Sequence, residues 1–402
     1  MTERLYYNDP YLREFDAVVR GVSRRGERLV VSLDRTAFYP TSGGQPFDTG
    51  TIGSYRVVDV LDENGGTIDH VVSDVPDTSI SPGAAIHGAI DWDRRFDHMQ
   101  QHTGQHVLSA AFDKRFGVRT VSFHLGAQSS TIDLAREMTA AEIAAAEDDA
   151  NRVVWEDRPV AIRYADAEEA AALPLRKESL RGGTLRLIEV EGFDLSACGG
   201  THVARTGAIG IVAIASWERF KGGQRLEFRC GARALARFRS QRDAMAGSVR
   251  LLSVLPEEIP ASIERLQSET KEQKRSLTAL QNELARFRAE ELAASAESLH
   301  GVRAVLRAVD ADANGLKALA TAIVSKPGHF VVLTSAVSPL LIVIARSTDV
   351  AVAANEILAA LIKQFGGRGG GRPEFAQGGG VEVGTQVLLV SARHDFVRRA
   401  QQ

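Results

Sequence analysis

Hydrophobic and polar positions alternate along much of the first 90 residues. Two segments show this pattern, each around a polar turn: AVVRGVSRRGERLVVSLD (residues 17–34) and YRVVDVLDENGGTIDHVV (55–72). Period-two alternation on both sides of a glycine-containing turn is typical of antiparallel β-hairpins. We therefore expect a small β-barrel or sandwich over residues 1–90.

The segment between these hairpins reads TAFYPTSGGQPFDTG, residues 36–50, and is dense in glycine, proline, serine and threonine. It is too polar and too interrupted to predict a core element. Loops of this length without strands of their own are usually functional. We expect a functional loop here, outside the hydrophobic core.

A helical period replaces the alternation after residue 90. Acidic residues come first, side chains at helical spacing follow, and a basic turn with a glycine ends the pattern: Asp91, Asp93, Phe96, Met99, Thr103, Val107, Lys114, Arg115 and Gly117. This order of charges and the final glycine match the start and stop signals of a helix. The sequence predicts a helix over 91–117.

A longer helical pattern covers residues 256–298. Spacings of three and four alternate along a seam with a polar break: Ile263, Leu266, Thr270, Gln273, Leu277, Leu280, Leu284 and Phe287. Such a heptad seam is typical of coiled coils. At 1.5 Å per residue the helix would run about 60 Å. It predicts an arm that pairs with another helix or separates two domains, although a helix packed along its own domain gives the same pattern.

The last hundred residues alternate between strand and helix patterns. VRAVLRAVD, GLKALATAIVSK, HFVVLTSAV, PLLIVIARS and VAVAANEILAALIKQF predict strand, helix, strand, strand and helix, which indicates a small α/β domain. The segment GGRGGGRPEFAQGGG (366–380) follows, with eight glycines in fifteen residues. We expect a fixed loop here that returns into a strand, VGTQVLLVSA.

Composition and charge narrow the class of protein. The chain has 402 residues, 44% of them hydrophobic and 25% charged, which excludes fibrous and wholly disordered chains. No segment resembles a membrane span or a signal peptide, so we expect a cytoplasmic protein. The net charge of −3 conceals a block of ten acids against three arginines at 137–170. The same net charge also conceals a block of ten basic residues against three acids at 201–250. This basic block is compatible with a phosphate-binding surface.

Two pairs of potential metal ligands stand out. His102 and His106 are one helical turn apart, and Cys198 and His202 flank two glycines in CGGTH. Three imidazoles and one thiolate form a complete tetrahedral set for zinc. HTGQH lacks the glutamate of the HExxH metalloprotease motif. Either pair alone would more often be ordinary core or surface residues, but together they predict a zinc site.

Two further residues remain outside this set. His98 precedes His102 by four positions and could be a partner of a ligand, an RNA contact or a solvated side chain, and we take the solvated side chain as the default. Cys230 alternates with Leu226 and Phe228, which predicts a thiol in the core of a strand.

Four motifs carry a resemblance to a known family. RTAFYPTSGGQPFDTG, RRFDHMQQHTGQHVLSAAF, VSFHLG and ACGGTHVARTGAIG occur in this order over roughly residues 25–235. They resemble the editing domain of alanyl-tRNA synthetases and the free-standing, AlaX-type alanyl-tRNA editing proteins of the long form. The resemblance implies Zn²⁺ bound by His102, His106, Cys198 and His202, and hydrolysis of tRNA(Ala) mischarged with serine or glycine. It places Thr36 and Gln45 near the acceptor pocket as candidate catalytic residues.

The glycine-rich segment carries a second resemblance. It is similar to the motif of the C-terminal domain of alanyl-tRNA synthetase, shared with the domain that accompanies DHH phosphodiesterases. That resemblance implies tRNA binding and a homodimer formed through the helical arm or this domain. Arg368, Arg372, Phe375 and Gln377 become candidate RNA contacts. The chain has no DHH triplet and no acidic two-metal cluster, which argues against a phosphodiesterase.

Together these features predict an α+β protein with four parts. They are a β-barrel-like domain (1–90), a zinc-dependent α+β editing domain (91–250), a helical arm (251–298) and a small α/β domain (299–402). The likeness to synthetases also implies nucleotide and ATP binding, but no aminoacylation domain is expected before the barrel. We expect a trans-acting deacylase. The alternative is a non-catalytic tRNA-binding protein stabilised by zinc.

Two aspects of this prediction stay open. A catalytic zinc normally keeps one coordination position free, whereas four protein ligands describe a closed structural site. A ligand could leave, the coordination could expand, or zinc could orient the substrate while an uncoordinated water attacks. Thr36 is our candidate for reading a seryl hydroxyl, against an ordinary turn threonine, and Gln45 could hold the ester carbonyl or the ribose.

Overall fold

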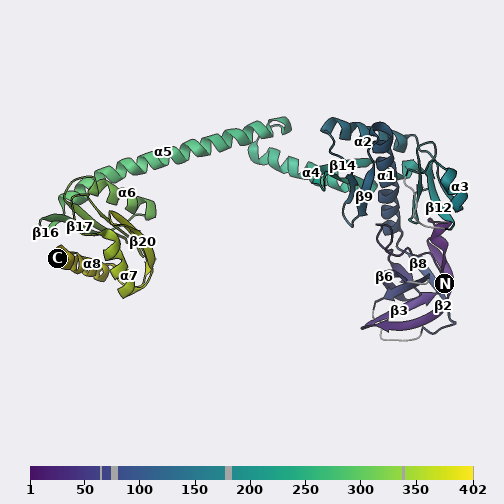
Figure 1. Ribbon diagram of the computed structural model, residues 1–402, viewed down its shortest axis with the longest axis horizontal. Coiled ribbons are helices and arrows are strands. Elements are labelled where there is room, and N and C mark those ends of the chain that lie inside the picture. The colour runs from purple at the N-terminus through teal and green to yellow at the C-terminus, as the bar shows by residue number, and fades with distance from the viewer. Residues whose placement is uncertain (64–65, 74–79, 177–182, 337–339, 402) are drawn as a thin grey trace. The chain divides into compact units, whose positions relative to one another are not determined.

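The computed structural model describes residues 1–63, 66–73, 80–176, 183–336 and 340–401. Contacts divide the chain into two compact units, Met1–Gly247 and Ser248–Gln402, which are coloured from purple to teal and from green to yellow in Figure 1. Both units contain helices and sheets, which confirms the predicted mixed α+β class.

A closed six-stranded barrel occupies the N-terminal part of the first unit. Its strands neighbour one another in the order β2-β3-β7-β6-β5-β8. Their bounds are β2 Glu14–Arg25, β3 Arg28–Leu33, β5 Gly50–Ile52, β6 Tyr55–Glu63, β7 Thr67–Val72 and β8 Ala85–Ile90. The predicted hairpins are the β2–β3 and β6–β7 pairs. Alternate side chains of each strand point inward and form one hydrophobic cluster, as the period-two pattern requires.

The segment 36–50 differs from its prediction because the structure buries much of it. Ala37 and Phe38 are fully buried, and Phe38 packs in the barrel cluster. Asp48 is also fully buried and is paired with the buried guanidinium of Arg95, with Nη2 and Oδ2 2.5 Å apart. The buried polar side chains of the segment, Thr36, Gln45 and Asp48, are satisfied by hydrogen bonds inside the protein, so polarity alone was a poor guide to exposure. The loop begins at β4 (Arg35–Thr36), which pairs with β1 (Glu3–Arg4).

Helix α1 (Trp92–Phe116) lies at the centre of the next part and confirms the predicted helix. Gly117 ends it in the left-handed conformation, with φ of 64°. Helix α2 (Ala140–Trp155) packs beside it and begins with a capping box between Thr139 and Glu142. A four-stranded sheet backs these helices in the order β14-β15-β10-β9. Its strands are β14 Val212–Phe220, β15 Gly223–Cys230, β10 Ser130–Leu134 and β9 Thr120–Leu125.

A second, three-stranded sheet supports the glycine loop of CGGTH. Its order is β11-β12-β13, with β11 Val160–Ala165, β12 Leu185–Val190 and β13 Asp194–Ala197. The short helices of this unit are η1 Leu5–Tyr7, α3 Ala167–Ala172 and η2 Thr206–Ile209. Cys198 follows the last residue of β13, so the sheet fixes where the loop begins.

The second unit contains one six-stranded sheet in the order β16-β17-β18-β19-β21-β20. Its strands are β16 Glu297–Leu299, β17 Val302–Val309, β18 His329–Ser335, β19 Leu340–Arg346, β20 Arg368–Arg372 and β21 Phe375–Val381. The helices are η3 Pro256–Glu258, α5 Ile259–Ala294, α6 Ala313–Val324, α7 Ala354–Phe365 and α8 Thr385–Ala400, and α4 (Gly231–Leu252) contains the boundary between the units. The predicted order from the first strand to α7 is confirmed.

Two predictions near the C-terminus are wrong. The glycine-rich segment is the hairpin β20–β21 rather than a loop. A Cβ on Gly369 would lie 2.5 Å from the Gln377 carbonyl oxygen, and a Cβ on Gly371 would lie 2.3 Å from the Phe375 carbonyl oxygen, so the glycines permit close strand pairing. VGTQVLLVSA begins helix α8 instead of a strand, because Leu388, Ala392 and Phe396 at helical spacing pack into the core.

Helix α5 has two different apolar faces. Ala285, Ala289 and Ala293 are buried in the cluster that includes α6. The predicted seam lies on another face, where Leu280 is 62% exposed and Phe287 is 66% exposed. No helix in the described ranges is long and apolar enough to span a membrane.

Candidate metal centre

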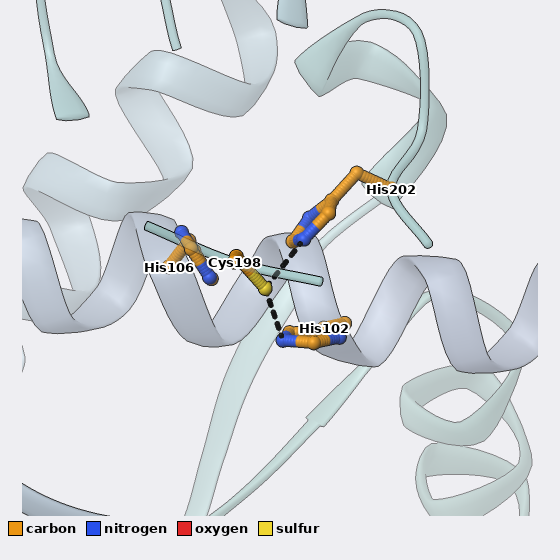
Figure 2. Close-up of side chains that lie close together, drawn as sticks. All are labelled: His102, His106, Cys198 and His202. Carbon is orange, nitrogen blue, oxygen red and sulfur yellow. Dashed lines mark hydrogen bonds between the residues drawn. The ribbon is translucent and has the colours of Figure 1, made fainter. Parts of the chain in front are cut away.

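Four side chains from two segments of the first unit converge at one point (Figure 2). His102 and His106 project from α1, and Cys198 and His202 come from the loop after β13. One potential ligand atom from each residue lies within 4.8 Å of the others. The Cys198 Sγ atom is 3.4 Å from His102 Nε2 and 3.3 Å from His202 Nε2. The structure therefore brings together the four residues that the two HxxxH and CxxxH spacings selected.

Each imidazole is held through its Nδ1 atom. His102 Nδ1 is 2.8 Å from Gln45 Oε1, and His106 Nδ1 is 3.0 Å from Asp194 Oδ2. His202 Nδ1 is 3.2 Å from the hydroxyl of Thr103. A proton on Nδ1 that donates to these oxygens leaves each Nε2 lone pair for a metal. Such partners orient metal-binding histidines and raise their basicity.

The loop from Cys198 to His202 is shaped by a glycine and an arginine. A Cβ on Gly200 would lie 2.2 Å from His102 Cε1, so only glycine allows this approach. Arg186 Nη1 donates to the carbonyl oxygens of Cys198 (2.7 Å) and Gly200 (3.0 Å). The arginine therefore holds the backbone on both sides of Gly199, which places the thiol.

Charges around the site favour a thiolate. Burial by itself would raise the pKa of the Cys198 thiol, but the imidazoles of His102 and His202 hold that pKa well below its usual range. Burial also opposes a charge on His106, yet its hydrogen bond to Asp194 raises the His106 pKa to about 9. These shifts favour a negative charge on Cys198 and a positive charge on His106. A bound cation would displace the His106 proton, as is usual when metals bind protein ligands.

The Asp194 carboxylate holds the His106 ring in place. Burial would raise its pKa, but the hydrogen bond from His106 and the nearby Arg176 guanidinium hold the pKa far below its usual range. Arg176 Nε donates to Asp194 Oδ1 at 2.6 Å, and the Ser196 hydroxyl lies within 3.1 Å of both carboxylate oxygens. Imidazole nitrogens and thiolates are ligands that zinc binds in tetrahedral sites. The residues present therefore fit a zinc ion.

Both polar atoms of the Gln45 side chain form hydrogen bonds to residues of the metal centre. Its Oε1 accepts from the Thr201 backbone N–H at 3.1 Å in addition to His102, and its Nε2 donates to Thr201 Oγ1 at 2.8 Å. Gln45 is fully buried. Its position makes it a residue that orients His102 and the loop, and its carbonyl oxygen is already occupied.

Thr36 lies at the end of β4 and is fully buried. Its Oγ1 atom accepts from the Phe38 backbone N–H at 3.1 Å and is 2.8 Å from His70 Nε2. His70 Nδ1 is in turn 2.9 Å from the Val31 carbonyl oxygen. Burial lowers the pKa of His70 to about 4, so the ring is neutral at pH 7. A fixed donor–acceptor chain therefore runs from the barrel to Thr36.

The two residues outside the ligand set have opposite outcomes. The default for His98 is wrong, because the side chain is buried, with 3% exposure, and burial lowers its pKa to about 3. Its Nδ1 has no hydrogen-bond partner among the described residues. The prediction for Cys230 is confirmed, since the thiol is fully buried on β15 and burial raises its pKa.

Sequence reasoning missed most of the residues that support the ligands. Asp194 and Arg186 lie outside the quoted motifs, and Thr103, although it lies inside HTGQH, was assigned only to the helical pattern. Each of the three meets its partner through the fold. Asp194 lies four residues before Cys198, which was its only signal. Among the candidate RNA contacts, Arg368, Arg372 and Gln377 are exposed on β20–β21, whereas Phe375 packs partly against the core.

Three family models match separate parts of the chain. They are described as tRNA synthetases class II (A) over residues 11–94, threonyl and alanyl tRNA synthetase second additional domain over 185–227, and DHHA1 domain over 301–400. An alanine–tRNA ligase from Pyrococcus abyssi is 34% identical over 94% of this chain, and one from Halobacterium salinarum is 37% identical over 95%. The chain spans only 42% of the length of either synthetase.

A shorter relative matches over nearly its whole length. The alanyl-tRNA editing protein AlaX-L from Pyrococcus horikoshii is 32% identical, and the match covers 94% of both chains. This chain belongs to the alanyl-tRNA editing protein family. Membership confirms the resemblance that the four sequence motifs indicated. The solved C-Ala domain of Aquifex aeolicus alanyl-tRNA synthetase also matches, at 22% identity over 25% of this chain and 96% of that domain, but its TM-score of 0.24 is too low to identify a shared fold.

Proposed function

We propose that this member of the alanyl-tRNA editing family is a hydrolase that deacylates tRNA(Ala) mischarged with serine, and also with glycine. The observation that carries the proposal is the set of three buried imidazoles and one partly exposed thiolate, with each imidazole held by a partner at Nδ1. The name of the Pyrococcus horikoshii relative supports the reaction. The substrate is an RNA ester, so we also propose that the protein acts in the cytoplasm.

His102, His106, Cys198 and His202 would hold zinc in this enzyme. A bound zinc ion would supply Lewis acidity or lower the pKa of a water molecule towards 7. The protein's own contribution is positional. Gln45 and Asp194 keep two rings in place, and the near-complete burial of the three imidazoles keeps bulk solvent away from their polar atoms.

Thr36 is our candidate for distinguishing seryl from alanyl esters. An apolar pocket rejects an added hydroxyl only about a hundredfold, whereas a pocket that hydrogen-bonds a hydroxyl rejects a group lacking it by roughly 10⁴-fold. The Thr36 hydroxyl is held in a fixed chain by His70 and the Phe38 N–H. This fixed orientation supports a role in selection rather than in a flexible turn.

The second unit would bind the RNA and a second copy of the chain. The exposed arginines of β20 and the match to the DHHA1 domain support RNA binding. The exposed seam of α5 supports a homodimer through the helical arm, since Leu277, Leu280 and Leu284 are each more than half exposed.

One observation favours the non-catalytic candidate. Four protein donors describe a closed zinc site, and closed sites are usually structural. In that case zinc would tie α1 to the loop after β13, and the protein would bind tRNA without hydrolysing its ester.

The experiment that separates these functions combines metal analysis with a deacylation assay. Purified protein is expected to contain one zinc per chain and to release labelled serine from Ser-tRNA(Ala) faster than alanine from Ala-tRNA(Ala). Cys198→Ala and His106→Ala should lose zinc and activity together, while Cys230→Ala, which removes the other thiol, should keep both. Wild-type protein that carries zinc yet leaves the seryl ester at its spontaneous hydrolysis rate would establish the non-catalytic function.

A further inference from the structure

A cluster of tyrosines and arginines borders the loop that carries Cys198. Tyr7 lies at the end of η1, and its ring is 5.5 Å from the guanidinium carbon of Arg186. Arg186 Nε also donates to the Tyr7 carbonyl oxygen at 2.9 Å. Tyr164, on the neighbouring strand β11, donates its hydroxyl to Asn8 Oδ1 at 2.8 Å. The cluster therefore joins η1 to the three-stranded sheet that ends at the metal centre.

Arg186 is a buried cation without a carboxylate partner among the residues that the structure describes. It is 8% exposed, and its hydrogen bonds go to backbone carbonyl oxygens of Tyr7, Cys198 and Gly200. Within the described ranges it forms no ion pair with a carboxylate, although the charge of the nearby Cys198 thiolate acts on it, and its Nη2 atom has no hydrogen-bond partner. An unsatisfied buried donor costs roughly 1–3 kcal/mol, and more when it is charged. Such a group is explained when a ligand supplies the missing acceptor.

The surface beside Arg186 is open and aromatic. Tyr164 is 50% exposed, Tyr7 is partly exposed, and Gly199 is exposed at the tip of the loop. A Cβ on Gly199 would lie 3.5 Å from the Tyr7 hydroxyl oxygen, so the loop tip and the ring adjoin. The nearby Arg4 already pairs with Asp62 at 2.7 Å, so among the described residues of this cluster Arg186 is the cation with an unused donor.

We propose that Tyr7, Tyr164 and Arg186 form a binding site for the 3′-terminal nucleotide of the RNA. Aromatic rings beside an arginine suit a nucleotide, because a base stacks on the rings and the guanidinium binds an oxygen of the phosphate. The inference rests on the proposed function, in which the ester is hydrolysed at the metal centre. The nucleoside that bears the ester must then lie within one nucleotide of the Cys198 loop, where this cluster is found.

The test uses the full chain and two short RNA hairpins. One hairpin ends in single-stranded ACCA with 2-aminopurine replacing the terminal adenine, and the other ends in ACC. Wild-type protein is expected to quench the 2-aminopurine and to bind the longer hairpin more tightly. Tyr164→Leu should abolish most of this quenching and weaken binding of the ACCA hairpin about tenfold, the effect of losing one stacked base. The same variant should bind the ACC hairpin as wild type does.

Matched variants separate this site from general RNA binding. Arg163→Gln alters the neighbour of Tyr164 on β11, which is exposed and pairs with Glu189 at 2.8 Å, and should change neither affinity. Tyr7→Leu provides a second removal of a ring, and circular dichroism and zinc content verify that each variant is folded. Equal loss of affinity for both hairpins, or unchanged quenching in both tyrosine variants, would overturn the proposal.

Arg186 is tested by the salt dependence of binding. Arg186→Gln is expected to reduce the slope of log Kd against log salt by about one for the ACCA hairpin, as losing one phosphate contact does. An unchanged slope would remove Arg186 from the site.

The hairpin measurements and the deacylation assay test this binding site and the proposed hydrolysis independently. The hairpin measurements need no ester, so a protein that does not deacylate but binds the terminal base would refute the enzyme and keep this site. A protein that deacylates Ser-tRNA(Ala) but does not quench the terminal 2-aminopurine would support the enzyme and refute this binding site.

Discussion

The hydrogen bond to His70 determines how the Thr36 hydroxyl is oriented. The neutral His70 ring donates from Nδ1 to the Val31 carbonyl oxygen, so its Nε2 atom accepts the Thr36 hydroxyl proton. Thr36 Oγ1 already accepts from the Phe38 N–H, which leaves it able only to accept from an incoming hydroxyl. Thr36→Val is therefore expected to narrow the ratio of seryl to alanyl deacylation by about tenfold, the value of one hydrogen bond to a buried group.

Steady-state deacylation of both esters measures this ratio. Thr36→Ser keeps the hydroxyl and should retain most of the discrimination. A wild-type ratio in Thr36→Val would make the threonine a structural residue of the turn.

His70 should also make the fold sensitive to acid. Its pKa is about 4 in the folded chain against 6.5 in the unfolded chain, so between these values only the unfolded chain takes up a proton. The stabilisation from neutral His70 is thus present at pH 7 and falls as the pH drops towards 4. From pH 7 to 4.5 this amounts to about 2 kcal/mol.

Urea unfolding at the two pH values tests this contribution. His70→Gln should lose about 2 kcal/mol less stability on acidification than wild type. His87→Gln, which replaces an exposed histidine of the same barrel, should lose as much as wild type. Identical acid sensitivity in wild type and His70→Gln would contradict the burial argument.

Individual residues differ in how far the sequence reveals them. The metal ligands were predictable because His102 and His106, and Cys198 and His202, keep a fixed local spacing. Asp194 and Gln45 were not assigned to the imidazoles, because the residues they hold are 88 and 57 positions away. Burial of His98 likewise depends on packing across the fold, which a helical period does not report.

At the level of elements, the loop from Cys198 to His202 depends on one of its two glycines more than on the other. A Cβ on Gly200 would collide with the His102 ring, whereas one on Gly199 would make only an ordinary contact with Tyr7. Gly200→Ala should therefore reduce zinc binding by at least tenfold, and Gly199→Ala should leave it unchanged. Competition with a zinc chelator measures both affinities, and equal affinities would exclude this steric argument.

The elements themselves were predictable where one local pattern dominated. Helix α1, with its acidic start and final Gly117, and the hairpins of the barrel follow from periodicity. The hairpin β20–β21 was missed because glycines rarely form strands, and here pairing with β19 provides the order. Helix α8 was taken for a strand because Val387 and Val390 favour strands locally, while Leu388, Ala392 and Phe396 fix the helix through the core.

A charged residue in the exposed seam of helix α5 should prevent the proposed dimer from forming. Leu280→Lys is expected to convert a dimer to a monomer, because Leu280 lies on the face away from Ala285 and Ala289 and would carry a charge into the proposed coiled coil. Gln281→Lys adds the same charge to the adjacent position outside the seam and should leave the dimer intact. Sedimentation equilibrium gives both masses, and a wild-type dimer that persists in Leu280→Lys would place the contact elsewhere.

On the scale of the whole molecule, hydrolysis and RNA affinity should be separable. The hydrophobic clusters of Met1–Gly247 share no residue with those of Ser248–Gln402, so the first unit has its own core. A chain ending at Gly247 is expected to keep the single-turnover deacylation rate at saturating enzyme. It should bind tRNA(Ala) at least tenfold more weakly and sediment as a monomer. Full-length affinity and mass in this shortened chain would show that the second unit serves neither purpose.

The contact between α1 and β15 constrains which sequences can build the metal centre. A Cβ on Gly104, midway between His102 and His106, would lie 2.2 Å from Cys230 Sγ. The space between the helix and the strand therefore holds only one side chain. A side chain can be added at Gly104 only if the Cys230 side chain is made smaller. Substitutions at these two positions should therefore be compensatory. This glycine also gives a reason why HTGQH has no bulky residue at its centre: the histidines reach the loop because the helix lies directly against the sheet.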